Sequence, residues 1–169
     1  MSRMSKRMVI GGTVIFFAVF IFWGWMLWPS EQERIQNLFD DLCEITSKTE
    51  DASAISDAMV VKDFRKFFAP RITIAIRSKA KIAGEHTDHE LSQQYGRLRL
   101  ASSRMGLHYE NLNFVSIDDE TASVSARFFA SWTGKSGKTI REDAHTQVGL
   151  TKVDGDWKFS QIDKMKKTR

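Results

Sequence analysis

The clearest feature of the hydrophobic pattern is an uninterrupted apolar run near the N-terminus. Residues 8–28 read MVIGGTVIFFAVFIFWGWMLW and contain no charged side chain. At about 1.5 Å of rise per residue, a helix of this length crosses the hydrocarbon core of a bilayer, which is roughly 30 Å thick. Only a helix satisfies the backbone groups of a single segment in lipid. The pattern therefore predicts a transmembrane anchor that contacts membrane lipid through Met8–Trp28.

The residues at the two ends of this run predict its orientation. Basic residues precede it and no acidic residue does; they are Arg3, Lys6 and Arg7. Such residues stay on the cytoplasmic side, whereas tryptophans favour the headgroup region. The tryptophans at the far end are Trp23, Trp25 and Trp28. We therefore expect a cytoplasmic N-terminus over 1–7, a single-pass helix over 8–28 and an exported domain over 29–169, which is periplasmic if the source is bacterial.

A cleaved signal peptide is the alternative interpretation of the same run. Its apolar core would be about 7–15 residues long and would end in small residues at a fixed spacing. The run here is longer, and the segment WGWMLWPS that closes it has no such pair of small residues. The uncleaved anchor is therefore the prediction.

After Pro29 the pattern becomes that of a folded domain that begins with helices. Over Ser30–Thr46, apolar residues recur at three- and four-residue steps, which predicts an amphipathic helix. A second helix is expected near Ala54–Phe68, and Pro70 ends it. Thr87 and Glu90 match a capping box, which predicts a third helix that begins there and runs to about residue 102.

Strands are predicted by alternation and by turn residues. RITIAIR, residues 71–77, alternates strictly. After the third helix, turn residues separate further strands, expected at 107–117, 121–133, 139–153 and 157–165. Helices first and an antiparallel meander afterwards predict an α+β domain, a curved antiparallel sheet with helices packed on its concave face.

Alternation also predicts which strand residues face the helices. The inner row of the strand at 121–133 contains Ala122, Val124, Ala126, Phe128, Ala130 and Trp132, and its outer row contains Ser123, Ser125, Arg127, Phe129 and Ser131. In the next strand the inner residues are Ala144, Thr146, Val148 and Leu150. In the last strand Trp157 and Phe159 face inward, followed on that face by Gln161 and Asp163 if there is no bulge.

This order of elements resembles the nuclear transport factor 2-like superfamily, a cone-shaped α+β fold. The resemblance covers about Ser30–Lys166 and rests on DFRKFFAPRITIAIR, DDETASVSARFFASW and VGLTKVDGDWKFSQID. Members range from isomerases and polyketide cyclases to transport factors and non-catalytic modules of membrane machines. An anchor followed by an exported cone is similar to certain bacterial envelope proteins, such as scaffold subunits of type IV secretion systems and proteins associated with lipid-import complexes.

Composition excludes two classes of function. Of the 25 basic residues three precede the anchor and none of the 21 acidic ones does, so the domain itself is almost neutral and no nucleic-acid partner is expected. Cys43 is the only cysteine, which rules out an intramolecular disulfide and a cysteine-based metal site. His86 and His89 lie beside acidic residues, but the capping box explains Thr87 and Glu90 and no spaced zinc motif occurs. We predict no metal and no cofactor.

Two kinds of functional residue remain. A pocket enzyme of the isomerase or cyclase type needs an inward acid, and the candidates are Asp163 or Glu142 with Tyr95 or Tyr109. The outer face of the sheet mixes one aromatic ring with polar groups, which suits docking of a protein partner or a second copy; its residues are Arg127, Phe129, Asp143, His145 and Gln147. No catalytic motif matches, so we expect a membrane-anchored, exported, non-catalytic module for assembly, partner docking or small apolar ligand binding. It would be a subunit of a bacterial envelope complex, with the pocket enzyme as the alternative.

Protease accessibility tests the predicted orientation. Protease added outside intact cells or spheroplasts should digest the chain after Trp28, because the anchor would place the domain outside. The intact mass of the mature protein should include residues 1–28. Protection of the domain until lysis would reverse the orientation, and a mature N-terminus beyond Ser30 would identify a signal peptide.

Overall fold

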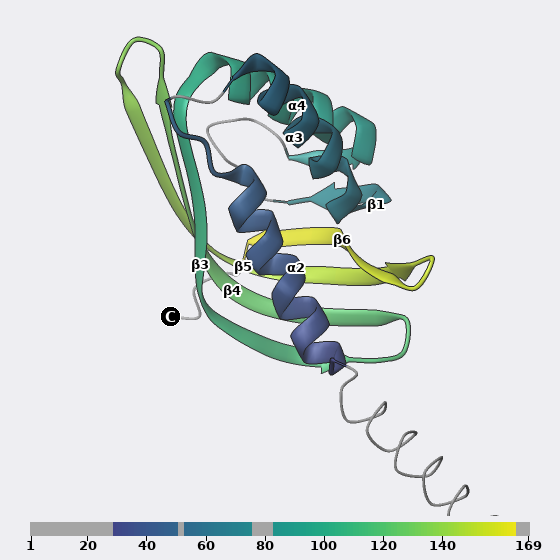
Figure 1. The fold of residues 1–169 in the computed structure, drawn as a ribbon. Coiled ribbons are helices and arrows are strands. Elements are labelled where there is room, and N and C mark those ends of the chain that lie inside the picture. Colours follow the sequence, from purple (N-terminus) through teal and green to yellow (C-terminus); the bar gives the residue numbers. More distant parts are fainter. Residues whose placement is uncertain (1–28, 51–52, 76–82, 165–169) are drawn as a thin grey trace, which may run out of the picture. The chain divides into compact units, whose positions relative to one another are not determined.

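The computed structural model describes residues 29–50, 53–75 and 83–164 (Figure 1). The chain divides into two compact units, residues 1–33 and 34–169. No helix among the described residues is long and apolar enough to cross a membrane, and the predicted anchor over 8–28 lies outside them. The fold below is that of the second unit, together with the first turn of its leading helix.

The predicted first helix is α2, Glu31–Thr46. Ser30 caps it: its hydroxyl accepts the Glu33 N–H at 3.2 Å, and the Glu33 carboxylate accepts the Ser30 N–H at 2.8 Å. The buried residues of this helix recur at the expected steps and are Ile35, Phe39, Leu42 and Thr46. The amphipathic pattern is therefore confirmed, and the buried stripe faces the sheet.

The predicted second helix ends earlier than expected. α3 covers Ala54–Phe64, a short 3₁₀ helix (η1) follows at Arg65–Phe67, and Phe68 already belongs to a strand. Two apolar residues of α3, Ile55 and Met59, are 77% and 65% exposed and take no part in the core.

The third helix, α4, covers Asp88–Ala101 and begins at the predicted capping box. It packs closely against α3. The Ser92 hydroxyl donates to the Val61 carbonyl at 2.7 Å, and a methyl group in place of hydrogen on Gly96 would lie 3.3 Å from the Val61 side chain. A small residue at position 96 therefore allows the two helices to approach.

The sheet has six strands in the order β2-β1-β6-β5-β4-β3. They are β1 Phe68–Ile74, β2 Gly84–Thr87, β3 Ser102–Ile117, β4 Thr121–Gly134, β5 Thr139–Val153 and β6 Asp156–Lys164. The predicted antiparallel meander is confirmed for β3–β6, whereas β1 pairs with β6 in parallel. Figure 1 shows the long strands curving around α2, with α3 and α4 beyond its C-terminal end. The predicted α+β class, with helices on the concave side, is therefore confirmed.

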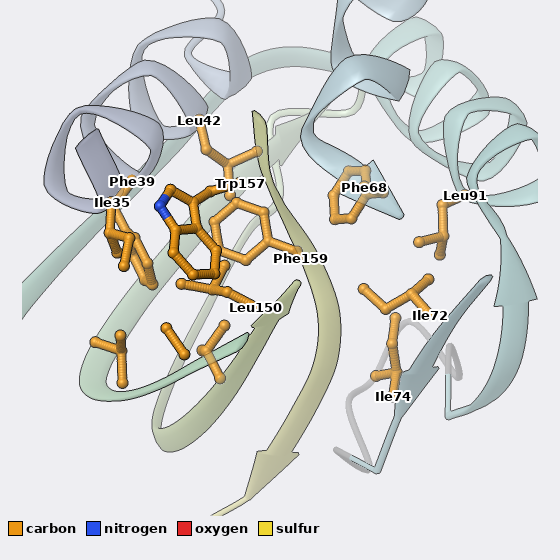
Figure 2. Close-up of a cluster of buried hydrophobic side chains, with 13 residues drawn as sticks. Ile35, Phe39, Leu42, Phe68, Ile72, Ile74, Leu91, Leu150, Trp157 and Phe159 are labelled. Carbon is orange, nitrogen blue, oxygen red and sulfur yellow. The ribbon is translucent and has the colours of Figure 1, made fainter. Parts of the chain in front are cut away.

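The predicted inner rows form the core. Val124, Val148, Leu150 and Phe159 are at most 2% exposed. Figure 2 shows α2 side chains pointing at the last two strands; the labelled residues there are Ile35, Phe39, Leu42, Leu150, Trp157 and Phe159. The Phe39 ring lies 5.0 Å from that of Phe159 and 5.9 Å from that of Phe128. Aromatic packing between α2 and the sheet therefore dominates this half of the core.

A bulge in β6 overturns one prediction. Leu150 pairs with Phe159 but Gly149 pairs with Gln161, so Ser160 is an extra residue. Ile162 then takes the inner row and packs on the core, while Asp163 pairs with outward-facing Gln147. The placement of Asp163 and Gln161 on the inner face is wrong, because the inserted residue reverses the alternation.

A buried cluster of charges joins the helices beside this core. The Asp57 carboxylate on α3 accepts hydrogen bonds from Arg99 Nε at 2.7 Å and Lys48 Nζ at 2.8 Å. The three side chains are 4–8% exposed. Arg99 also donates to the carbonyls of Ile45 and Ser47 at the end of α2, and Lys48 donates to the Arg99 carbonyl. The cluster thus supplies partners to helix-end carbonyls that burial would otherwise leave without water.

The charge of Asp57 is set by two opposing effects. Burial raises the pKa of its carboxyl, but the hydrogen bonds and positive charges of Lys48 and Arg99 outweigh burial and hold the pKa below its ordinary value. A group whose pKa is lowered by folding stabilises the folded state above the ordinary pKa. This contribution disappears as the pH falls through the lowered value.

Asp57→Asn should therefore lower the free energy of unfolding by about 3–5 kcal/mol at neutral pH, because it leaves two buried cations without their anion. Chemical denaturation of the two proteins measures the difference. The penalty should shrink below about pH 4 and vanish once the native carboxylate is protonated. Asp63→Asn on the same helix is the control: its 45%-exposed carboxylate pairs with Lys66, and the loss should be at most about 1 kcal/mol. Equal losses from both would contradict the structural role of the cluster.

Candidate functional site

A cavity of about 1120 Å³ lies between the concave side of the sheet and the helices. Its walls come from α4, from the ends of α2 and α3, and from all the long strands. Most of the lining is apolar or aromatic and includes Phe64, Leu91, Leu98, Phe128, Trp132 and Ile162. A space of this size and character suits a small organic molecule.

Three hydroxyl groups of the cavity wall take part in structural hydrogen bonds. Tyr95 Oη donates to the Ile45 carbonyl at 3.1 Å and accepts from Arg99 Nη1 at 2.8 Å. Burial raises the Tyr95 pKa more than Arg99 lowers it, so the phenol stays protonated. Thr46 donates to the Leu42 carbonyl at 2.8 Å, and Thr146 to the Ala126 carbonyl at 3.4 Å. These groups hold the wall in place.

Glu142 is the inner-row acid of the cavity. It pairs with Ala130 across β4 and β5, and both residues line the cavity. The other acid of the lining, Asp143, lies in the outer row and accepts a hydrogen bond from Arg127 Nη2 at 2.8 Å. Of the predicted acids and tyrosines, Glu142 and Tyr95 therefore line one cavity.

The charged residues of the cavity lining come from one half of β5 and from α4. β6 pairs with β5 only over Thr146–Val153. Within the described residues, positions 139–145 of β5 pair with β4 alone, and this part of β5 carries Arg141 and Glu142. Across the cavity from them α4 contributes Gln94 and Arg97. Arg97 and Arg141 are exposed, and we call the part of the lining that they form with Gln94 and Glu142 the mouth of the cavity.

The other predicted acid and tyrosine lie elsewhere. Asp163 is on the outer face, where its carboxylate accepts a hydrogen bond from Gln161 Nε2 at 2.6 Å. Tyr109 belongs to an inner row, opposite Phe128, but does not line the cavity; its hydroxyl donates to Asp40 at 2.6 Å. Burial and the Asp40 carboxylate both raise the Tyr109 pKa. Tyr109 therefore fastens β3 to α2.

The single cysteine is no nucleophile in this structure. Burial, with a smaller contribution from the charge of Asp40, raises the pKa of Cys43 to about 11. Almost all of the thiol is protonated near pH 7, and the thiolate is the reactive form.

The sequence matches the family model of the SnoaL-like domain over residues 39–163. The chain belongs to this SnoaL-like family. Its cavity and its six-stranded curved sheet therefore confirm the predicted nuclear transport factor 2-like fold. None of the curated proteins matches the sequence significantly.

Several solved structures share the fold of this SnoaL-like domain. A protein described as an aromatic ring hydroxylase from Novosphingobium aromaticivorans is 13% identical, with a TM-score of 0.61, over 82% of this chain and 93% of that one. A protein described as a scytalone dehydratase from the same bacterium is 15% identical, with a TM-score of 0.56, over 79% and 81%. A hexachlorocyclohexane dehydrochlorinase, LinA type 2, is 13% identical, with a TM-score of 0.56, over 79% and 83%. These likenesses show the fold.

The outer face of the SnoaL-like domain carries a second cluster. The rings of His108 and Phe129 stack 4.7 Å apart with planes 5° from parallel, and the Arg127 guanidinium lies 4.7 Å from the centre of the Phe129 ring. Arg127 also pairs with Asp143. The predicted outward rows of β4 and β5 are thus confirmed. His108 was missed, because its position opposite Phe129 depends on the register of β3 and β4.

The His86–Glu90 segment is used for helix capping. The Glu90 carboxylate accepts the Thr87 N–H at 2.8 Å, which completes the predicted capping box. Asp88 pairs with Arg65 at 2.6 Å, and His89 shares a hydrogen bond with Gln93 at 2.9 Å. No group of three or more potential ligands that could hold a metal ion occurs in the described part of the chain.

The two adjacent phenylalanines of β4 give a test of the row assignment. Phe128→Ala should lower the free energy of unfolding by about 3 kcal/mol, because the ring packs on the core between Phe39 and Tyr109. Phe129→Ser removes only the contacts with His108 and Arg127 and should cost about 1 kcal/mol or less. Denaturant titration measures both. Equal losses would mean that β4 is buried on both faces.

Proposed function

We propose that this SnoaL-like domain is a pocket enzyme that takes a small, largely apolar molecule and transfers a proton with Glu142. The observation that carries the proposal is the cavity of about 1120 Å³, in which Glu142 is the one inner-row acid and most of the lining is apolar or aromatic. A carboxyl group within reach of a bound molecule can act as a general acid or base.

The surroundings of Glu142 favour it over the other polar groups of the wall. Its inner-row neighbours on β4 and β5 are Ala130 and Ala144, whose short side chains leave room beside the carboxyl group. The hydroxyls of Tyr95, Thr46 and Thr146 donate to backbone carbonyls and would have to break these bonds to act on a ligand. Chemistry is therefore expected at the mouth, with binding in the apolar interior.

The relatives support proton transfer as the reaction class. Two of the similar structures are described as a dehydratase and a dehydrochlorinase. Such reactions remove a proton from carbon together with a leaving group, and one carboxylate can accept that proton. Members of one fold differ widely in activity, so the similarity supports the class of step and not a particular substrate.

Membrane attachment is the second part of the proposal, and it rests on the sequence alone. The apolar run over 8–28 and the basic residues before it favour an anchored, exported domain, periplasmic in a bacterium. An anchored pocket would meet apolar molecules near the bilayer, where they concentrate.

A docking module without catalysis is the second candidate. The observation that favours it is the outer-face cluster of His108, Arg127 and Phe129, because aromatic and arginine side chains are enriched where proteins bind one another. A second copy of the chain or an envelope protein would be the partner. Phe129→Ser should weaken such an association, as measured by sedimentation.

Glu142→Gln separates the two candidates. The full-length chain is incubated in D₂O with a panel of cyclic ketones and chlorinated cycloalkanes, and deuterium incorporation and chloride release are measured. We expect the wild type to accelerate one of these reactions and Glu142→Gln to lose about 100-fold or more of the rate. The variant should still bind the same compound, because the apolar wall is unchanged.

Glu110→Gln is the matched control, since Glu110 is an exposed residue of β3 opposite Arg127 and does not line the cavity. It should keep the full rate. A Glu142→Gln protein with undiminished activity would remove Glu142 from the proposal, and binding without turnover across the panel would favour the docking module.

A further inference from the structure

We propose that the cavity takes a carboxylate-bearing molecule whose carboxylate lies at the mouth between Arg97 of α4 and Arg141 of β5. The inference rests on the proposed function in one respect, namely that the cavity is the binding site. It adds the chemical class of the ligand and the way in which the ligand is oriented.

The ion pairs of the protein single out these two arginines. Every other arginine in the described residues has a carboxylate partner within 4.0 Å: they are Arg34, Arg65, Arg71, Arg99, Arg104 and Arg127. Within the same residues, neither Arg97 nor Arg141 makes a hydrogen bond, an ion pair or a ring contact. Both line the same cavity, although one comes from a helix and the other from a strand far along the chain.

The unused donors at the mouth include a third group. Gln94 of α4 lines the same cavity as Arg97. Within the described residues, its side chain also makes no hydrogen bond. Two guanidinium groups and one amide therefore offer N–H donors at the mouth. A carboxylate is an acceptor with no donor of its own, and its two oxygens match the parallel N–H groups of a guanidinium.

The charges of the mouth also favour an anion. Of its charged groups, Asp143 is paired with Arg127 on the outer face, which leaves Arg97 and Arg141 against Glu142. The mouth therefore carries one more positive than negative group. Arg97 and Arg141 are both exposed, so water and salt screen this excess in part, and its attraction for a bound anion depends on ionic strength.

The interior predicts the rest of the molecule. Behind the mouth lie Phe64, Phe68 and Phe159, whose neighbouring ring centres are 4.9 Å and 5.9 Å apart. The hydroxyls that could bind a polar substituent there already donate to carbonyls. A ligand with an apolar body and one terminal carboxylate thus matches both regions, and it would lie with its carboxylate end beside Glu142.

The test compares acids with neutral molecules of the same shape. Binding of 2-naphthoate and 2-naphthamide, decanoate and decanamide, and a four-ring aromatic acid with its amide is measured on the full-length chain by calorimetry. We expect the acid of at least one pair to bind about tenfold or more tightly than its amide. Raising the salt concentration should reduce this preference.

Variants identify the groups responsible. Arg97→Gln and Arg141→Gln should each weaken binding of the preferred acid by about tenfold and leave binding of its amide unchanged. Arg104→Gln is the matched control: this exposed arginine pairs with Glu50, does not line the cavity and should bind both compounds as the wild type does.

The outcomes separate this inference from the proposed function. If amides bind as tightly as acids, or if the acid preference survives both cavity variants, the carboxylate inference is wrong and the binding cavity remains. If no acid and no amide binds, the cavity is not a binding site, and the inference and the proposed function are both wrong. Acid preference that depends on Arg97 and Arg141 in a protein without turnover would support the inference while opposing the enzyme.

Discussion

The buried contact of Asp57 with Arg99 and Lys48 is the interaction on which the rest of the domain depends. It joins α3 to α4 and to the segment after α2, and Lys48 also forms a backbone bridge to Met105 at the start of β3. Because one carboxylate balances only one of the two positive charges, the remaining charge is directed at the carbonyls at the helix ends. The helices are thereby held over the sheet by directional bonds as well as by apolar contacts, and directional bonds fix orientation more narrowly.

This arrangement has consequences for the cavity. Arg99 reaches Tyr95, so the same network that joins the helices also fixes a side chain of the cavity wall. The Tyr95 hydroxyl therefore bonds to groups of the helix layer, and its ring adds apolar surface to the cavity wall. The residues to which we assign ligand chemistry, Glu142, Arg97 and Arg141, lie outside that network. Under the proposed function, the apolar body of a ligand would lie in the interior, where the hydroxyls of Tyr95 and Thr146 already donate to carbonyls, and its polar end would lie at the mouth.

Sequence patterns predicted the parts of the fold that depend on local periodicity. The capping box at Thr87, the stripe of α2 and the alternating rows of β4 and β5 are each encoded within a few neighbouring residues, and all are confirmed. The bulge at Ser160 was not predictable in this way, because it depends on the register of β6 against both β5 and β1. One inserted residue was enough to remove Asp163 from the candidate site.

The charged residues were less predictable for a related reason. Asp57 looks like a solvent-facing helix residue until α4 brings Arg99 to it from 42 positions along the chain. The sequence around Arg97 and Arg141 does not predict that they lie together, since only the folded domain brings a helix residue and a strand residue to one cavity. Glu142 was predicted because strand alternation alone places it inward. The local pattern thus predicts burial well and predicts polar partnerships poorly.

Within the described residues, β5 divides into a half that pairs with two strands and a half that pairs with β4 alone. Residues 146–153 of β5 are held between two strands and carry core side chains, so a change there disturbs the whole domain. Residues 139–145 are held by β4 alone within the described residues, and they carry Arg141 and Glu142. Substitutions in this half can therefore alter charge and shape at the mouth without changing the core residues of 146–153. Related domains can therefore diverge in substrate by changing a few adjacent positions of a single hairpin, while the core residues further along β5 stay the same.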